Sequence, residues 1–209
     1  MKTKVAFPFL AVCLAACFAA LLFCAGCASA GGDSDAGTVV STTHQVVTTS
    51  GTATVIVTFN RPEKFTDLKS SSMGSGRDRA GLMDDIRDYV VGLMPRYLSG
   101  GRTFSVTFND IDMAGEYEPW LGVAMQDVRI IKGIYPPRIA LDFSLKDAGG
   151  AVIASGSRTL TDMNFMSTVA PATVFRDDRL RYEKTLLNDW LRGEFTTLRR
   201  SGETNNNKN

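Results

Sequence analysis

Histidine and cysteine are nearly absent from this chain of 209 residues. The single histidine is His44, and the four cysteines all lie between Cys13 and Cys27. Downstream of residue 52 the chain therefore lacks a Ser-His-Asp triad, a thiol nucleophile and the side chains that usually bind zinc. It also cannot form a disulfide there, so its stability has to come from a packed core.

A strong charge of either sign is missing as well. The chain has 23 lysine and arginine residues against 22 aspartate and glutamate residues. This balance argues against a nucleic-acid partner, which would normally require a basic surface. No glycine-rich loop is followed by the lysine that a phosphate-binding loop needs. We therefore expect no nucleic acid and no cofactor.

The N-terminus, by contrast, has the pattern of an export signal. Lys2 and Lys4 precede an apolar run over residues 5–24, and small residues follow it. The Cys-Ala-Gly-Cys sequence at residues 24–27 is similar to a bacterial lipobox. It predicts a lipoprotein signal peptide over residues 1–26 and lipidation of Cys27. The alternative is ordinary signal cleavage after Ala30.

The residue after the lipobox cysteine bears on location. Ala28 stands where bacterial lipoproteins retained at the inner membrane often carry aspartate. By that resemblance we expect an outer membrane lipoprotein that faces the periplasm and is held to the membrane by its N-terminal lipid. If cleavage instead follows Ala30, the protein would be soluble in the periplasm or secreted.

Composition divides the remainder of the chain into three parts. Residues 27–52 are rich in Gly, Ser, Thr and Asp and predict a flexible tether, in which the valine pairs at residues 39–40 and 46–47 are compatible with a weak edge strand. Residues 53–198 predict a single α+β domain. Residues 199–209 are polar and predict a disordered tail.

Hydrophobic periodicity predicts the elements of that domain. Apolar and polar residues alternate in four segments, which predict strands, and a fifth short strand is expected over residues 128–131. Gly156 predicts a bulge in the last of the four. Two segments with three- and four-residue spacing predict helices. The fold class is α+β, an antiparallel sheet of four to five strands with two amphipathic helices on one face. The strand segments are residues 53–59, 103–108, 139–145 and 151–160, and the helices are residues 78–94 and 179–197.

The long connection between two of these strands is the candidate binding surface. It is dense in carboxylates and aromatic rings and includes one arginine before the returning strand. Its rings could line a groove for glycan or extended peptide, since rings stack on sugars and prolines. The competing interpretation, which we favour, is that Trp120 and Tyr135 plug the end of the sandwich. The candidate residues are Asp110, Asp112, Glu116, Tyr117, Glu118, Trp120, Tyr135 and Arg138.

Two glutamates in this connection could form a catalytic pair of acids, but their spacing does not support that role well. Glu116 and Glu118 would share a strand face about 6.5–7 Å apart, which approaches the separation of paired acids in glycoside hydrolysis. A catalytic pair flanks its substrate from opposite sides, which two neighbours on one strand face do poorly. The favoured interpretation is therefore that these glutamates form a charged rim or salt bridges to Arg129 and Arg138.

The same glutamates could join Asp110 and Asp112 in an oxygen-ligand calcium site. No EF-hand pattern is present, and solvated aspartates at a strand end are the favoured interpretation. We therefore expect no metal and assign no catalytic residue.

Several short pieces together resemble an uncharacterised family of exported proteobacterial proteins, domain of unknown function 3016. They include Gly-Glu-Tyr-Glu-Pro-Trp at residues 115–120, Phe-Thr-Asp at 65–67, Tyr-Pro-Pro-Arg at 135–138 and Asp-Met-Asn-Phe at 162–165. The resemblance covers roughly residues 55–195. It implies a secreted or periplasmic location. It implies no activity, so no functional residue is carried over from it.

These observations favour a non-enzymatic envelope lipoprotein that acts as a binding or assembly module. Its expected partner is another envelope protein or peptidoglycan. The alternative function is a carboxylate-dependent enzyme acting on cell-wall glycan, with Glu116 or Glu118 as the acid.

Overall fold

The structure is a computed structural model. It describes residues 38–68, 76–126, 128–167 and 178–206. The predicted signal peptide and Cys27 lie outside the described residues. Within the described part, no helix has the length and apolar character needed to cross a membrane.

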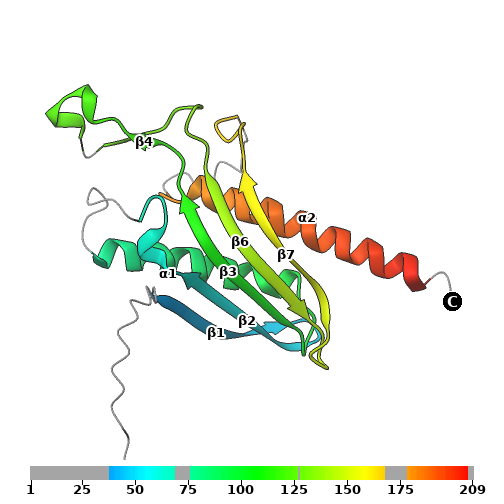
Figure 1. Cartoon of the computed structure of the whole chain (residues 1–209). Coiled ribbons are helices and arrows are strands. Elements are labelled where there is room, and N and C mark those ends of the chain that lie inside the picture. Colours follow the sequence, from blue (N-terminus) through cyan, green and yellow to red (C-terminus); the bar gives the residue numbers. More distant parts are fainter. Residues whose placement is uncertain (1–37, 69–75, 127, 168–177, 207–209) are drawn as a thin grey trace, which may run out of the picture. The chain divides into compact units, whose positions relative to one another are not determined.

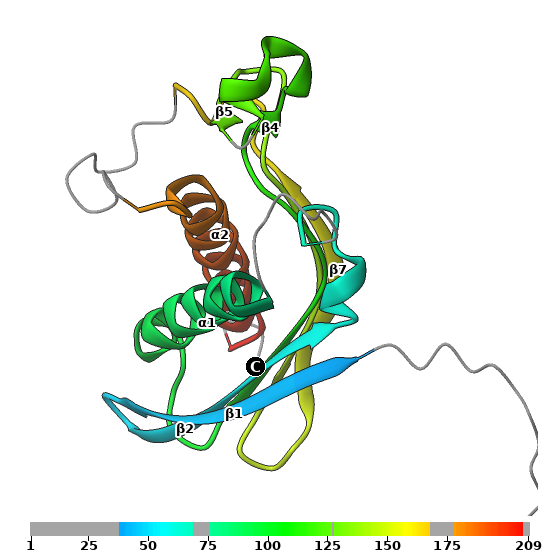
Figure 2. The same cartoon turned by 90° about the vertical axis from the view of Figure 1, so that its left-hand side faces the viewer.

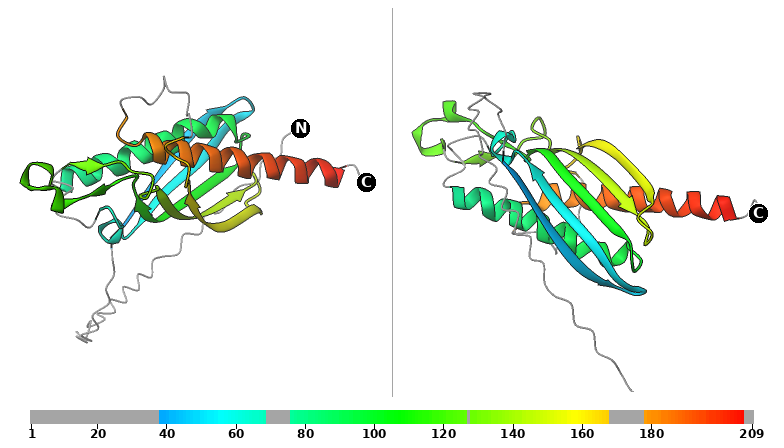
Figure 3. Two further views of the ribbon diagram at one scale, coloured as in Figure 1. Left: turned by 90° about the horizontal axis from the view of Figure 1, so that it is seen from above. Right: turned by 60° about the horizontal axis from the view of Figure 1, so that its bottom comes forward.

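Five strands form the main sheet, in the spatial order β1-β2-β3-β6-β7 (Figure 1, and Figure 3, right). β2 and β3 pair in parallel, and the other neighbours are antiparallel. The parallel pair departs from the predicted antiparallel sheet because a helix connects these two strands, and a crossover of that kind returns the chain in the same direction. The α+β class is confirmed. The strands are β1 Val39–Thr48, β2 Gly51–Asn60, β3 Thr103–Asp112, β6 Arg138–Lys146 and β7 Val152–Thr161.

β1 corrects the predicted tether. It pairs with β2 along its whole length, from Val39 opposite Asn60 to Thr48 opposite Gly51. The segment is rich in Ser and Thr and has little apolar pattern, but as an edge strand it needs only backbone pairing and one half-buried face. The tether prediction is therefore wrong for residues 39–48, and β2 already begins at Gly51.

Two helices cover the sheet, and Figure 2 shows both on the same side of it. α1 spans Gly76–Leu93 and α2 spans Arg181–Asn206. Pro95 lies in a short 3₁₀ turn after α1, as expected for a residue that lacks an N–H and cannot continue an α-helix. The buried side chains of both helices join those of β2, β3 and β6 in one core. From the helices these are Leu82, Ile86, Val90, Leu93, Leu186, Leu187 and Leu191.

α2 begins close to the predicted position but ends later than the sequence predicted. The Leu180 N–H donates to Oδ1 of Asp178 at 2.8 Å, so Asp178 caps the start of the helix. The helix then runs to Asn206, so the predicted disorder is wrong for residues 199–206. Extending an existing helix costs far less than starting one, which allows a polar segment to remain helical. Residues 207–209 lie outside the described part.

Gly156 does not form the predicted bulge, because the register of β7 is irregular elsewhere, between Leu145 and Lys146 of its partner β6. Gly156 stands opposite Phe143 in regular pairing. A Cβ on Gly156 would lie 2.7 Å from Nη1 of Arg158. The missing Cβ therefore leaves room for the Arg158 guanidinium, which lies 5.1 Å from the Phe143 ring centroid.

Candidate functional site

Residues 116–126 and 128–134 extend beyond the end of the main sheet, between β3 and β6 (Figures 1 and 2). We call this segment the projecting loop. Its base is a two-stranded sheet of β4 Glu116–Tyr117 and β5 Arg129–Ile130, so the short strand predicted at residues 128–131 is present. Two 3₁₀ turns, Pro119–Leu121 and Val123–Met125, form the part between these strands.

Arg129 holds the base of the projecting loop to the domain. Its Nη1 and Nη2 donate to the two carboxylate oxygens of Asp67 at 3.0 and 2.7 Å. It also donates to the carbonyls of Met113, Ala114 and Gly115. Burial lowers the pKa of Arg129, but the hydrogen bonds and charge of Asp67 outweigh burial and raise that pKa above its usual value. The guanidinium is thus a charged, fully engaged anchor.

Asp67 also accepts a hydrogen bond from the Met113 N–H at the end of β3. The pair therefore joins three segments that are far apart in sequence. No spacing rule in the sequence identifies Asp67 and Arg129 as partners, because 62 positions separate them. The sequence instead suggested salt bridges from Glu116 and Glu118 to Arg129, whereas Arg129 pairs with Asp67 and Glu118 pairs with Lys132.

Glu118 is buried, with only 2% of its surface exposed. Its two oxygens accept from Nζ of Lys132 at 2.7 and 2.6 Å, and Tyr135 donates its hydroxyl to Oε1 at 2.9 Å. The Lys132 hydrogen bond holds the pKa of Glu118 below its usual value, and the hydrogen bond to Glu118 raises the pKa of Tyr135. Glu118 is therefore a structural carboxylate, and the prediction that it belongs to an exposed surface is wrong.

Three large apolar residues in the two 3₁₀ turns are exposed. The exposed fractions are 70% for Trp120, 48% for Leu121 and 83% for Val123. We call these three residues the apolar tip. Trp120 does not plug the end of the sandwich, which overturns the interpretation favoured from sequence. Tyr135, by contrast, is half-buried, and its hydroxyl donates to the buried Glu118.

Four candidate residues line one cavity of about 330 Å³ beside the loop base: Asp112, Glu116, Tyr135 and Arg138. Nη2 of Arg138 lies 3.7 Å from Oδ2 of Asp112. Burial raises the pKa of Asp112, and the nearby charge of Asp67 adds to this rise. The structure thus brings half of the predicted set together and gives it one carboxyl group that protonates more readily than usual.

The other predicted residues lie elsewhere. Asp110 accepts from the backbone N–H of Thr66 at 2.6 Å and from its hydroxyl at 2.8 Å, which ties β3 to the segment after β2. Tyr117 lines a different cavity of about 580 Å³ together with Arg129 and Tyr182. Within the described residues, no cluster of three or more His, Cys, Asp or Glu side chains is arranged to hold a metal ion.

Glu183 is a buried carboxyl group outside the set of candidate residues predicted from the sequence. Its Oε1 accepts from the Ala114 N–H at 2.7 Å, and its Oε2 has no partner among the described residues. Burial raises the pKa of Glu183 from 4.5 to about 7, although the Ala114 hydrogen bond partly opposes this rise. The side chain joins α2 to the segment between β3 and the projecting loop.

A family model described as a protein of unknown function, DUF3016, matches residues 53–193. The chain belongs to the DUF3016 family. The resemblance noted in the sequence is thereby confirmed. No curated protein and no solved structure matches this chain significantly. The matched span of this DUF3016 protein contains Asp67, Arg129, Glu118 and the apolar tip.

Proposed function

We propose that this DUF3016 protein is an exported, lipid-anchored binding module that faces the periplasm and contacts another envelope protein through its apolar tip. The export pattern and the lipobox ending at Cys27 support the location. The single observation that carries the binding role is the exposure of Trp120, Leu121 and Val123 on a segment that extends away from the sheet.

These three side chains are not part of the core that the described residues form. The core is already formed by the sheet and both helices. Contiguous exposed apolar residues at one position commonly mark an interaction site. Tryptophan is also enriched among the residues that dominate binding energy at protein interfaces.

The base of the projecting loop supports the same role. Arg129 and Lys132 each hold the base through an ion pair with a largely buried carboxylate, Asp67 or Glu118. A contact segment that is ordered before binding loses less conformational entropy when it meets its partner. The polar network thus serves to present the apolar tip in one orientation.

Site-specific photo-crosslinking tests this function. A photoreactive residue replaces Trp120 in one variant and Val47 in a matched control, since Val47 is also a strongly exposed apolar residue, on β1. We expect one discrete adduct in the envelope from position 120 only, and its loss when Val123→Ser is added. The same adducts from both positions would contradict a role for the apolar tip.

The second candidate function is hydrolysis of cell-wall glycan, and the observation that favours it is Asp112. A carboxyl group with a raised pKa that lines a cavity is a reasonable general acid. Glu116 lines the same cavity and would act as the second carboxylate. Incubation of the purified protein with peptidoglycan would release soluble fragments, and Asp112→Asn and Glu116→Gln would each prevent the release.

The lipid anchor has its own test. Mass spectrometry of the mature N-terminus is expected to show a start at Cys27 that carries lipid. An unmodified N-terminus at Gly31 would contradict the anchor and favour ordinary signal cleavage after Ala30.

A further inference from the structure

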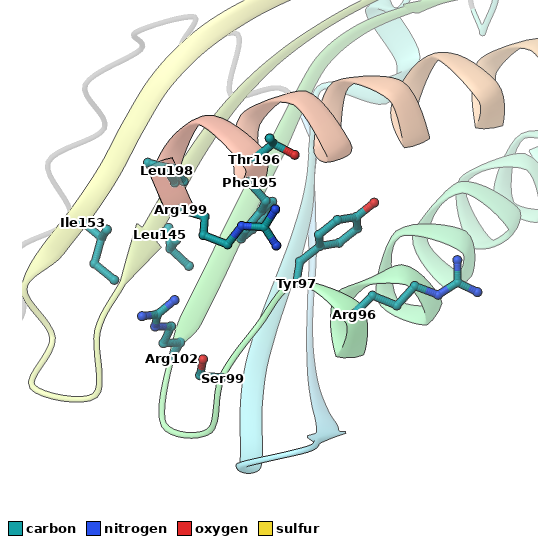
Figure 4. A pocket seen from close by; sticks show the side chains of 10 residues that line it. All are labelled: Arg96, Tyr97, Ser99, Arg102, Leu145, Ile153, Phe195, Thr196, Leu198 and Arg199. Atoms are coloured by element: carbon teal, nitrogen blue, oxygen red, sulfur yellow. The ribbon is translucent and has the colours of Figure 1, made fainter. Parts of the chain in front are cut away.

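A second large cavity, of about 590 Å³, lies at the end of β3 opposite to the projecting loop (Figure 4). The projecting loop follows the last residues of β3, whereas this cavity is lined by Arg102, which directly precedes β3. Its other walls come from the segment after α1, from α2 and from the hairpin of β6 and β7. We call it the arginine cavity. Its lining residues are Arg96, Tyr97, Ser99, Arg102, Leu145, Ile153, Phe195, Thr196, Leu198 and Arg199.

One wall of the arginine cavity is apolar and firmly packed. Tyr97 and Phe195 stack with ring centroids 5.1 Å apart, and Phe195 also packs against Phe104 of the core. Leu145 is buried, whereas Ile153 at the rim is exposed. The cavity therefore has a preformed apolar surface that extends from the core to the solvent.

The charged groups of the cavity are all of one sign. Three arginines line it, and none of the described residues that line it is acidic. Most other arginines of the described part form ion pairs, but Arg96, Arg102 and Arg199 form none with any described side chain. Those that are paired are Arg87, Arg129, Arg138, Arg158, Arg179 and Arg192.

Figure 4 shows how the three guanidiniums differ. Arg199 extends toward Tyr97, and Arg102 extends toward Leu145 and Ile153, whereas Arg96 points away from the other two. Two guanidiniums therefore lie directly beside the apolar wall. A ligand that satisfies this arrangement has an anionic end and an apolar body.

We propose that the arginine cavity binds an amphipathic monocarboxylate, such as the anion of a medium-chain fatty acid. A guanidinium forms paired, charge-assisted hydrogen bonds with a carboxylate, which assigns the anionic end to Arg102 and Arg199. The apolar chain would lie along Phe195 and Leu145. The volume is within the range of small-molecule sites, about 300–1,000 Å³.

A highly charged ligand fits less well than a single carboxylate. α1 ends at Leu93, just before the cavity, and the C-terminal end of a helix carries partial negative charge.

The ligand proposed for this cavity differs from the protein partner proposed for the apolar tip, and neither proposal depends on the other.

Titration of the full mature protein with dodecanoate, below its micelle concentration, tests the proposal by calorimetry. We expect saturable binding that weakens about tenfold or more in Arg102→Gln and in Arg199→Gln. Ile153→Glu, which places a carboxylate at the rim, should abolish binding. The matched control is Arg192→Gln, since Arg192 lies on the same helix but does not line the cavity.

Two further probes separate the chemistry and the source of the ligand. Dodecanol, which lacks the charge, should bind at least about tenfold more weakly than dodecanoate. Equal binding of the two, or equal dodecanoate binding by wild type, Arg102→Gln and Arg199→Gln, would overturn the proposal. The proposal would also be overturned if the protein did not bind dodecanoate but bound anionic phospholipid vesicles through Arg102 and Arg199. The anion would then be a membrane headgroup. Circular dichroism of each variant shows whether the fold is retained.

Discussion

Nζ of Lys132 lies 2.6 Å from Oε2 of Glu118, and this ion pair stands at the base of the segment that carries the apolar tip. The lysine is partly exposed, but the glutamate is buried. A buried carboxylate is tolerated because the lysine and the Tyr135 hydroxyl replace the water that it loses. This ion pair therefore helps to hold the loop base and, with it, the position of the apolar tip.

Lys132→Met should destabilise the protein, because it leaves the Glu118 carboxylate buried with only Tyr135 as a partner. The lysine lowers the pKa of Glu118 in the folded state, so its stabilisation is present above the unfolded pKa of about 4.5 and is lost as the pH falls through the folded value. The urea midpoint should therefore differ from wild type most at neutral pH and least in acid. The double variant Glu118→Gln with Lys132→Met should be more stable than Lys132→Met alone at neutral pH, and the opposite order would contradict this account.

Glu183→Gln should change how stability depends on pH. The folded-state pKa of Glu183 is raised from 4.5 to about 7, so its contribution is full below about pH 4.5 and is lost as the pH rises toward 7. The shift corresponds to about 3 kcal/mol at most. Urea unfolding between acid and alkaline pH measures this decline in the free energy of unfolding. We expect Glu183→Gln to lack the decline. Glu116→Gln, at an exposed position, is the control and should retain the decline.

Arg129→Leu should lower the free energy of unfolding by about 3–5 kcal/mol, the usual effect of removing one partner of a buried ion pair. It leaves Asp67 unpaired and removes the hydrogen bonds to three carbonyls. Limited proteolysis should then cut the projecting loop sooner than in wild type. The control is Arg192→Leu, whose partner Asp189 is exposed and whose loss should change stability by less than about 1 kcal/mol. Equal effects of the two substitutions would contradict the anchoring role of Arg129.

The two tryptophans should differ in solvent access. Trp120→Phe leaves Trp190, which packs against Phe104 and Phe143, and Trp190→Phe leaves the exposed Trp120. Acrylamide should quench the fluorescence of Trp190→Phe more strongly than that of Trp120→Phe. Addition of the partner captured by photo-crosslinking should reduce the quenching of Trp190→Phe only, because this variant retains Trp120. Equal quenching of both variants would show that Trp120 is covered in solution.

Gly156→Ala and Gly193→Ala should have opposite effects. A Cβ at Gly156 displaces Arg158 from the Phe143 ring, which should cost about 1 kcal/mol. A Cβ at Gly193 meets no atom within 4 Å, and alanine favours the helix, so this substitution should stabilise by about 0.5–1 kcal/mol. Thermal unfolding of the two variants measures both effects. Stabilisation by Gly156→Ala would contradict the role assigned to the missing Cβ.

Local patterns were sufficient for most of the secondary structure. The alternation Val55, Val57, Phe59 and the helical spacing Leu82, Ile86, Val90 each identify an element and its buried face, because strand and helix periods differ. For β1 the sequence allowed only a weak edge strand within a tether, because an edge strand is stabilised mainly by backbone pairing with β2, which leaves little mark on its own side chains. The end of α2 was missed because a polar segment can extend a helix that other residues start.

The sequence by itself determined the class of the fold, the likeness to DUF3016 and the export pattern, because each depends on residues that are close together in the chain. Tertiary structure alone decided which polar residues of the long connection are buried and which apolar residues are exposed. Glu118 and Trp120 are two positions apart, yet one lies against Lys132 and the other faces solvent. The physical reason is that burial and ion pairing depend on partners brought together by folding, such as Asp67 with Arg129, which no local pattern records.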